Sequence, residues 1–173
     1  MLYMVECDYT DPQSEKAWNS FYSEQKLPAL IAVPGFLTSQ RFIRLSGPAA
    51  QYLAIHSLTG ADVLHSDSYR LNGGGNFGAW QDHIARWSRH VFEGAATMPD
   101  VRSEETLRFE TDLVTAPSSS SSLVIRCVEL DSKPGLCGLS VIPRSAIFED
   151  SESPSVTFYA PLTEQLITAE TKG

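Results

Sequence analysis

The chain has 173 residues, of which 42% are hydrophobic and 20% are charged, a globular balance that can fill one core without metals or disulfides. Thirteen lysines and arginines against 21 aspartates and glutamates give a formal net charge of −8, and this acidic balance argues against nucleic acid as a partner. No apolar run approaches the roughly 20 residues that a membrane span needs, so we also expect no membrane partner.

Cysteine and histidine usage gives no sign of a metal centre. The cysteines are odd in number and form no C-x-x-C pair, which predicts buried thiols rather than a zinc site or a disulfide framework; they are Cys7, Cys127 and Cys137. The four histidines are spread along the chain, so we predict neither a metal nor a cofactor. The chain begins in a strand-like run without a basic leader, and we expect a cytoplasmic protein.

The first third of the chain alternates strand and helix signals. Residues 2–9 alternate like a strand, and Asp11-Pro12 can open a helix whose stripe of Trp18, Phe21 and Tyr22 needs a packing partner. Pro28 and then Pro34-Gly35 are expected to break that helix.

Residues 36–45 and 51–58 predict a second and a third strand joined at Gly47-Pro48 as a hairpin. A short helix is expected from Thr59 to about Tyr69, and a glycine run at 72–76 follows it. A further helical turn at 79–84 then leads to a fourth strand at 87–93.

This order, β-α-β-β-α-β, predicts an α+β fold: a ferredoxin-like unit over residues 2–95, with a four-stranded antiparallel sheet and both helices on one face. The other face is half apolar, and it must be covered by a second copy or by the rest of the chain. The side chains assigned to that face are Tyr3, Cys7, Gln40, Phe42, Tyr52 and His56.

Residues 96–173 are less regular. Strands are expected at 106–114, 123–130, 139–148 and 156–161, and the serine-rich run 117–122 reads as a loop or linker. Two interpretations stay open, a strand-rich extension that braces the sheet and a degenerate second copy of the first unit.

Several motifs stand out in the first half of the chain: Trp18, the run 21–30, the Val33-Pro34-Gly35-Phe36 turn and Arg41-Phe42. These motifs resemble the dimeric α/β-barrel superfamily, and within it the EthD-like and related uncharacterised bacterial branches. The resemblance implies a homodimer with a small-molecule cavity, and the superfamily includes cofactor-free enzymes and haem proteins. Lys26 stands where such proteins commonly carry the histidine of an H-L-P segment, and it would either bind an anion or be solvated.

The candidate chemistry is acid–base catalysis inside that barrel. His56 is the expected acid or base, and Tyr52 is expected to orient the substrate. The expected substrate-binding residues are Tyr3, Gln40, Phe42, Arg44, Trp80, His83 and Arg89. The sequence thus predicts a protein that binds a small aromatic or polyketide-like molecule, and the predicted activity is that of a cofactor-free isomerase, cyclase, dehydratase or lactone hydrolase. A non-catalytic binding or assembly module is the alternative, and haem binding is the third.

Overall fold

The structure is a computed structural model, and it describes residues 1–72, 74, 77–113, 122–131, 135–149 and 153–169. Most of the predicted glycine run and all but the last residue of the serine-rich run 117–122 lie outside these residues.

The first half carries four strands with helical segments between them. The strands are β1 (Leu2–Tyr9), β2 (Phe36–Ser46), β3 (Tyr52–Leu58) and β4 (Ile84–Glu93). The helical segments are α1 (Glu15–Phe21), the π-helix η1 (Tyr22–Lys26), α2 (Leu27–Ile31), η2 (Ala61–His65), α3 (Asp67–Leu71) and η3 (Gly78–His83). The strands predicted in this half are confirmed, with small shifts at their ends.

The second half is nearly all strand. It contains β5 (Glu105–Glu110), β6 (Leu123–Leu130), β7 (Leu136–Pro143), the 3-10 helix η4 (Arg144–Glu149), β8 (Val156–Pro161) and the short β9 (Leu166–Ile167). The strands predicted at 123–130 and 156–161 are confirmed with these bounds, whereas the strand expected at 139–148 begins earlier and ends at Pro143.

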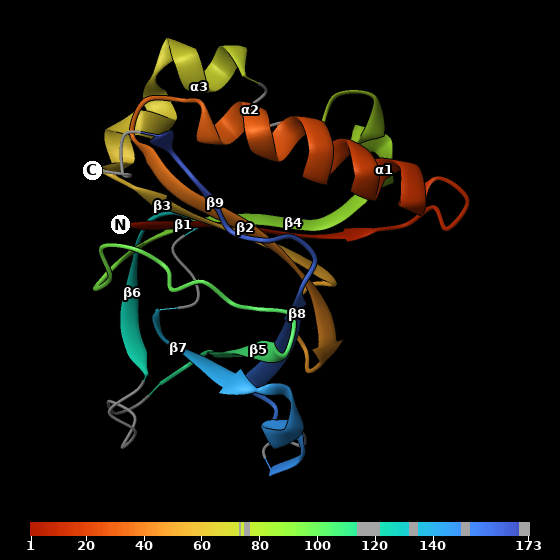
Figure 1. Cartoon of the computed structure of the whole chain (residues 1–173), viewed down its shortest axis with the longest axis vertical. Coiled ribbons are helices and arrows are strands. Elements are labelled where there is room, and N and C mark those ends of the chain that lie inside the picture. The colour runs from red at the N-terminus through yellow and green to blue at the C-terminus, as the bar shows by residue number, and fades with distance from the viewer. Residues whose placement is uncertain (73, 75–76, 114–121, 132–134, 150–152, 170–173) are drawn as a thin grey trace.

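Eight antiparallel strands close into one barrel. Around the ring the order is β3-β1-β4-β6-β7-β5-β8-β2, and β2 pairs with β3 to complete the circle, while β9 adds to β2. Figure 1 shows α1, α2 and α3 together on one side of the barrel, over β1 to β4, with β5 to β8 on the opposite side. The strand order is the same in both halves: β2-β3-β1-β4 in the first and β6-β7-β5-β8 in the second.

This architecture corrects the predicted fold. The chain is a closed β-barrel with few, short helices, so the ferredoxin-like unit and the resemblance to the dimeric α/β-barrel superfamily are wrong. The sheet does not stop at four strands, because β6 pairs with the edge strand β4 and β8 pairs with the edge strand β2. The second half of the chain therefore covers the sheet face that a second copy was expected to cover. The homodimer stays a prediction, and the argument from an uncovered sheet face no longer supports it.

The barrel wall separates two hydrophobic cores. The inner core fills the barrel, and its largest members include Leu2, Met4, Phe42, Leu53, Ile55, Phe92, Phe109 and Tyr159. The outer core lies between the strands and the helices, and its members include Tyr3, Cys7, Tyr9, Trp18, Tyr22, Tyr52 and Phe77. The predicted assignment of faces is therefore wrong for Tyr3, Cys7 and Tyr52, which point at the helices, whereas Phe42 points into the barrel.

Register explains why the predicted face mixed two sets of residues. In the β2–β3 pair Ser39 lies opposite His56, whereas Gln40 lies opposite Ile55, and the pairing shifts by one residue between Phe36 and Thr38. Because a one-residue shift moves every later side chain to the other face, Gln40 cannot share a face with His56.

Candidate functional site

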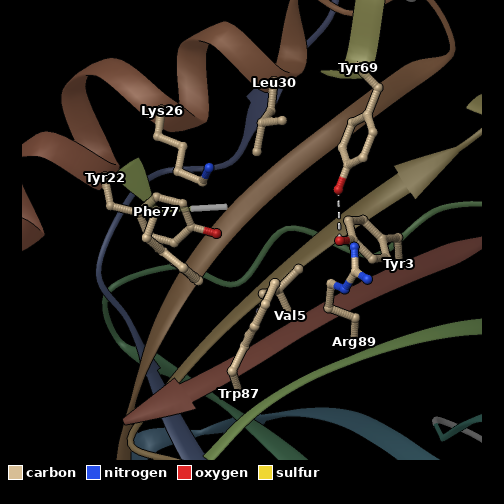
Figure 2. A pocket seen from close by; sticks show the side chains of 9 residues that line it. All are labelled: Tyr3, Val5, Tyr22, Lys26, Leu30, Tyr69, Phe77, Trp87 and Arg89. Carbon is tan, nitrogen blue, oxygen red and sulfur yellow. Dashed lines mark hydrogen bonds between the residues drawn. The ribbon is translucent and has the colours of Figure 1, made fainter. Parts of the chain in front are cut away.

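A small pocket lies between the helices and the outer face of the sheet. Figure 2 shows Tyr22 and Lys26 reaching into it from the helical side and Tyr3, Val5 and Arg89 from the strands. Its lining consists of Tyr3 and Val5 of β1, Tyr22 and Lys26 of η1, Leu30 of α2, Tyr69 of α3, Phe77, and Trp87 and Arg89 of β4. Seven of these nine side chains are aromatic or basic, a composition suited to a planar molecule that carries negative charge.

The π-helical turn η1 places two of these side chains. The backbone N–H of Leu27 donates to the carbonyl of Tyr22, five residues back, instead of following the α-helical pattern. Pro28 lies just after this turn, where it has no N–H to donate and its ring would crowd the carbonyl of Glu24 in an α-helix. The wider turn relieves this conflict, so the chain continues into α2 and does not break at Pro28 as predicted.

Lys26 is a buried cation in an aromatic setting. Its side chain belongs to a residue only 8% exposed, and its Nζ lies 5.3 Å from the centre of the Phe77 ring and 5.8 Å from that of Tyr22. Burial lowers the pKa of the ammonium group from 10.5 to about 8. Of the two alternatives for Lys26, a solvated side chain is therefore wrong, and an anion-binding role remains.

A pair of tyrosine hydroxyls forms another side of the pocket. The hydroxyl groups of Tyr3 and Tyr69 are 2.9 Å apart, and Figure 2 shows them meeting beside Arg89. Ser66 is the N-cap of α3, and its Oγ accepts a hydrogen bond from the backbone N–H of Tyr69, so the cap directly positions this tyrosine. Burial raises the pKa of Tyr3 well above its usual value, so its hydroxyl stays protonated and can donate to a ligand oxygen.

Trp87 and Arg89 form the outer rim on β4. The guanidinium carbon of Arg89 lies 5.1 Å from the centre of the Trp87 ring, and Trp87 is 37% exposed. The backbone N–H of Arg89 donates to the Oδ2 of Asp131 at 2.7 Å. The backbone at the rim is thus fixed, while the side chain of Trp87 is open to solvent.

The free space among these side chains is about 10 Å³, room for about one water molecule. A larger ligand must displace a rim side chain, and Trp87 is the most exposed candidate.

The predicted catalytic residues do not lie inside the barrel. His56 points to the helices, stacks on the ring of Tyr3 at 5.5 Å between centres, and has its Nδ1 2.8 Å from the Oγ of Ser39. Burial, with a smaller effect of Lys26, lowers the pKa of His56 to about 3, so this imidazole is neutral near pH 7. It supports the floor of the pocket from behind Tyr3 and does not line it.

Tyr52 lies farther along the same outer face. Its hydroxyl donates to the Oε1 of Glu15 at 2.6 Å and accepts from the Nδ2 of Asn19, which fastens α1 to β3. Gln40 and Phe42 point into the barrel instead. The amide of Gln40 is held by the backbone of Val101 and Thr163, and Phe42 is fully buried, so both have structural roles.

The remaining predicted ligand contacts are dispersed. Arg44 donates to the carbonyl of Ala49 at the end of the hairpin. Trp80 packs on Phe21 with 6.0 Å between ring centres, and His83 lies 5.7 Å from the Tyr9 ring. Of the predicted substrate-binding residues, the pocket brings together only Tyr3 and Arg89.

The sequence analysis did not select as site residues four side chains that line the pocket from the helical side: Tyr22, Leu30, Tyr69 and Phe77. For Lys26 it considered two roles, an anion-binding residue and a solvated one. A signal existed for Tyr22 and Lys26, because residues four apart on one helix share a face. Tyr69 and Phe77 flank the glycine run and carry no such pattern.

Among the described residues, no group of three or more histidine, cysteine, aspartate or glutamate side chains is placed to hold a metal ion. In the same part of the chain, no helix has the length and apolar character needed to cross a membrane. Comparison of the chain with protein-family models, with curated proteins and with solved structures finds no match.

Proposed function

We propose that this chain binds a small aromatic molecule carrying an anionic oxygen in the pocket between the helices and the outer sheet face. The buried ammonium group of Lys26 among aromatic rings carries the proposal. A cation that has lost much of its water is stabilised by an incoming anion more than a solvated lysine is. The rings of Tyr22 and Phe77 supply the apolar surface that a planar ligand needs.

Arg89 and the tyrosine pair complete the recognition. Arg89 can hold a carboxylate or phenolate from the rim, and the hydroxyls of Tyr3 and Tyr69 can donate to a second oxygen. A neutral ligand of the same shape lacks the negative charge that the Lys26 ammonium and the Arg89 guanidinium attract, so the pocket should discriminate by charge.

Binding of benzoate and 2-naphthoate, measured by calorimetry beside their neutral amides benzamide and 2-naphthamide, tests this proposal. We expect the acids to bind and the amides to bind at least tenfold more weakly, which corresponds to about 1.4 kcal/mol. At pH 8 the acids should also cause proton uptake, because an anion raises the lowered pKa of Lys26.

The Lys26→Met variant should lose the preference for acids, whereas Lys16→Met, which changes an exposed lysine on α1, should keep it. Equal binding of acids and amides, or no binding of any acid to the wild-type protein, would refute the proposal.

Cofactor-free acid–base catalysis in the same pocket is a second candidate, favoured by the pKa of about 8 at Lys26. A lysine that is partly neutral near pH 8 can remove a proton from a bound carbon acid. Exchange of the acidic C–H hydrogens of phenylpyruvate in D₂O, followed by NMR, tests this step. We expect faster exchange with the wild-type protein than with Lys26→Met; equal rates would leave binding alone as the function.

A further inference from the structure

On the barrel side of β4, three side chains form a connected polar chain. The Sγ of Cys127 on β6 lies 3.9 Å from the Nδ1 of His90 on β4, and the Nε2 of His90 lies 3.7 Å from the Oε2 of Glu6 on β1. His90 is 4% exposed and Glu6 is 8% exposed, whereas Cys127 is partly exposed. The outer pocket uses none of these three residues.

One tautomer of His90 satisfies both contacts. Cys127 can donate its S–H to the Nδ1 of His90 only if the ring proton is on Nε2, and that proton then points at the carboxylate of Glu6. The thiol has a second acceptor within reach, the backbone carbonyl of Glu129 at 3.8 Å. A nucleophile beside a base that a third group orients is the usual arrangement of residues in covalent catalysis, and such contacts are often long before a substrate binds.

We propose that Cys127 is a nucleophile, that His90 accepts its proton, and that Glu6 orients the imidazole, so that this end of the barrel is a second site that accepts acyl groups from small esters or thioesters. In the first step the S–H proton passes to the Nδ1 of His90 while the sulfur bonds to the acyl carbon. The bond to the leaving alcohol or thiol breaks, and His90 returns the proton to that group. Water then hydrolyses the thioester on Cys127 with His90 again as the base.

The electrostatics favour a neutral pair over a preformed ion pair. Burial raises the pKa of the Cys127 thiol and lowers that of His90, so the resting state is thiol and imidazole. The proton therefore moves when the sulfur attacks, as it does from a serine to its histidine. The carboxylate of Asp131 raises the pKa of both groups, and it stabilises the imidazolium once that has formed. Cys127 in turn raises the pKa of the buried Cys137 thiol, for which burial is the larger cause.

Glu6 is held by donors that favour its charged form. Ser88 and Tyr159 lie 3.4 and 3.5 Å from its two carboxylate oxygens. Burial raises the pKa of Glu6 and the charge of Asp8 acts in the same direction, while the hydroxyls and the charge of Arg86 oppose this. Glu6 therefore has the donors needed to sit as a carboxylate beside His90.

A hollow beside this chain offers space for a substrate. Its volume is about 550 Å³, within the range of roughly 300 to 1,000 Å³ typical of small-molecule sites, and it is open to solvent. Glu6, Ser88 and His90 form part of its wall, together with Arg86, Phe109, Asp112 and Asp131, and Cys127 adjoins this wall through His90. The wall carries three carboxylates against the guanidinium of Arg86, which should disfavour acyl donors with an anionic group, so we expect neutral or cationic esters.

The test uses p-nitrophenyl acetate and intact protein mass spectrometry. We expect a burst of one nitrophenol per chain, with the acetyl group on Cys127, and loss of the burst in Cys127→Ala. In the wild-type protein the rate should rise with an inflection below pH 6.5 and then stay level to pH 8, because the deprotonated imidazole is the active form. A free thiol would instead gain about tenfold per pH unit up to its pKa near 8.5.

Variants of His90 and Glu6 test whether these residues activate the Cys127 thiol or whether the thiol reacts only because it is exposed to solvent. His90→Gln and Glu6→Gln should slow acetylation at pH 7 by at least tenfold, whereas His65→Gln, which changes an exposed histidine, should not slow it. Cys7 and Cys137 are 2% and 0% exposed and should stay unmodified in every folded variant, which serves as an internal check of folding. Acetylation elsewhere, or a wild-type rate that rises like that of a free thiol, would overturn the proposal even if a variant fails to fold.

Discussion

The guanidinium carbon of Arg41 lies 4.2 Å from the centre of the Tyr22 ring, so β2 contacts the π-turn of the helical layer directly. The same guanidinium donates to the Oγ of Ser23 and to the carbonyl and Oδ1 of Asn19, and it lies 5.1 Å from the Trp18 ring. Arg41 is fully buried and ties the helices that carry Tyr22 to the barrel.

Replacement of Arg41 by Met should therefore destabilise the protein. The variant leaves the partly buried oxygens of Asn19 and Ser23 without these donors and removes the cation from the rings, and a loss of about 2 kcal/mol is expected. Urea unfolding at pH 7 measures it. Arg126→Met, at an exposed arginine 4.0 Å from Glu93, is the control and should change stability by less than about 0.5 kcal/mol. Equal effects of the two variants would contradict the role of Arg41.

Replacement of Lys26 should instead stabilise the protein, because burial of its ammonium group lowers the free energy of unfolding. The folded pKa is about 8 and the unfolded value is 10.5, so the unfolded chain binds more protons between these values and stability rises with pH across that window. Lys26→Met removes the penalty and should stabilise the protein by about 1 to 3 kcal/mol at pH 7, with the gain vanishing near pH 10.5. Denaturant unfolding at several pH values checks this, and a destabilised variant at pH 7 would contradict it.

Because the pKa of His56 is lowered in the folded protein, we expect the protein to lose stability in mild acid. Its folded pKa of about 3 lies below the unfolded value of 6.5, so between these values the unfolded chain takes up a proton that the folded chain does not. Stability should then fall by about 1.4 kcal/mol for each pH unit below 6.5. His56→Gln should flatten this slope between pH 6 and 4, and the exposed His65→Gln should leave it unchanged. Unchanged slopes in both variants would exclude His56 as its cause.

The sequence was sufficient for local elements but not for closure of the barrel. Alternating residues and turn signals located β1, β3, β6 and β8, because these features act over a few residues. Barrel closure depends on the pairing of β6 with β4 and of β8 with β2. These strands are far apart in sequence, and no local pattern specifies their pairing. The helix motifs of residues 18–42 carry no information about those pairings.

The candidate pocket itself was not predicted from the sequence. Tyr3 and Arg89 were expected to line a cavity inside the barrel, whereas they line the pocket on the helical side, and the register shift near Phe36 puts His56 and Gln40 on opposite faces. The pKa of His56 depends on burial by Tyr3 and Phe36, both within 5.5 Å between ring centres, and burial follows only from the assembled structure. The π-turn that places Lys26 likewise depends on how Pro28 is accommodated in the assembled helices.

The two seams between the halves of the barrel each carry a glycine, and these glycines should be intolerant of a side chain. Gly47 follows β2 with φ +105°, and a Cβ there would lie 2.4 Å from the carbonyl oxygen of Val156 on β8. Gly94 follows β4 with φ +104°, and a Cβ there would lie 2.4 Å from the carbonyl oxygen of Val124 on β6. In both places the obstacle is backbone of the neighbouring strand, which cannot move without loosening the seam.

Gly47→Ala and Gly94→Ala should therefore each destabilise the protein by more than the roughly 1 kcal/mol of an unfavourable backbone angle alone. Gly78→Ala isolates that smaller term, because Gly78 has φ +58° and no atom within 4 Å of its added Cβ. Thermal and urea unfolding give the stabilities. Hydrogen exchange should show faster opening of β8 in Gly47→Ala and of β6 in Gly94→Ala, whereas Gly78→Ala should leave both strands protected. If all three variants lose the same stability, the close approach of the neighbouring strand is not the reason that Gly47 and Gly94 are required at the seams.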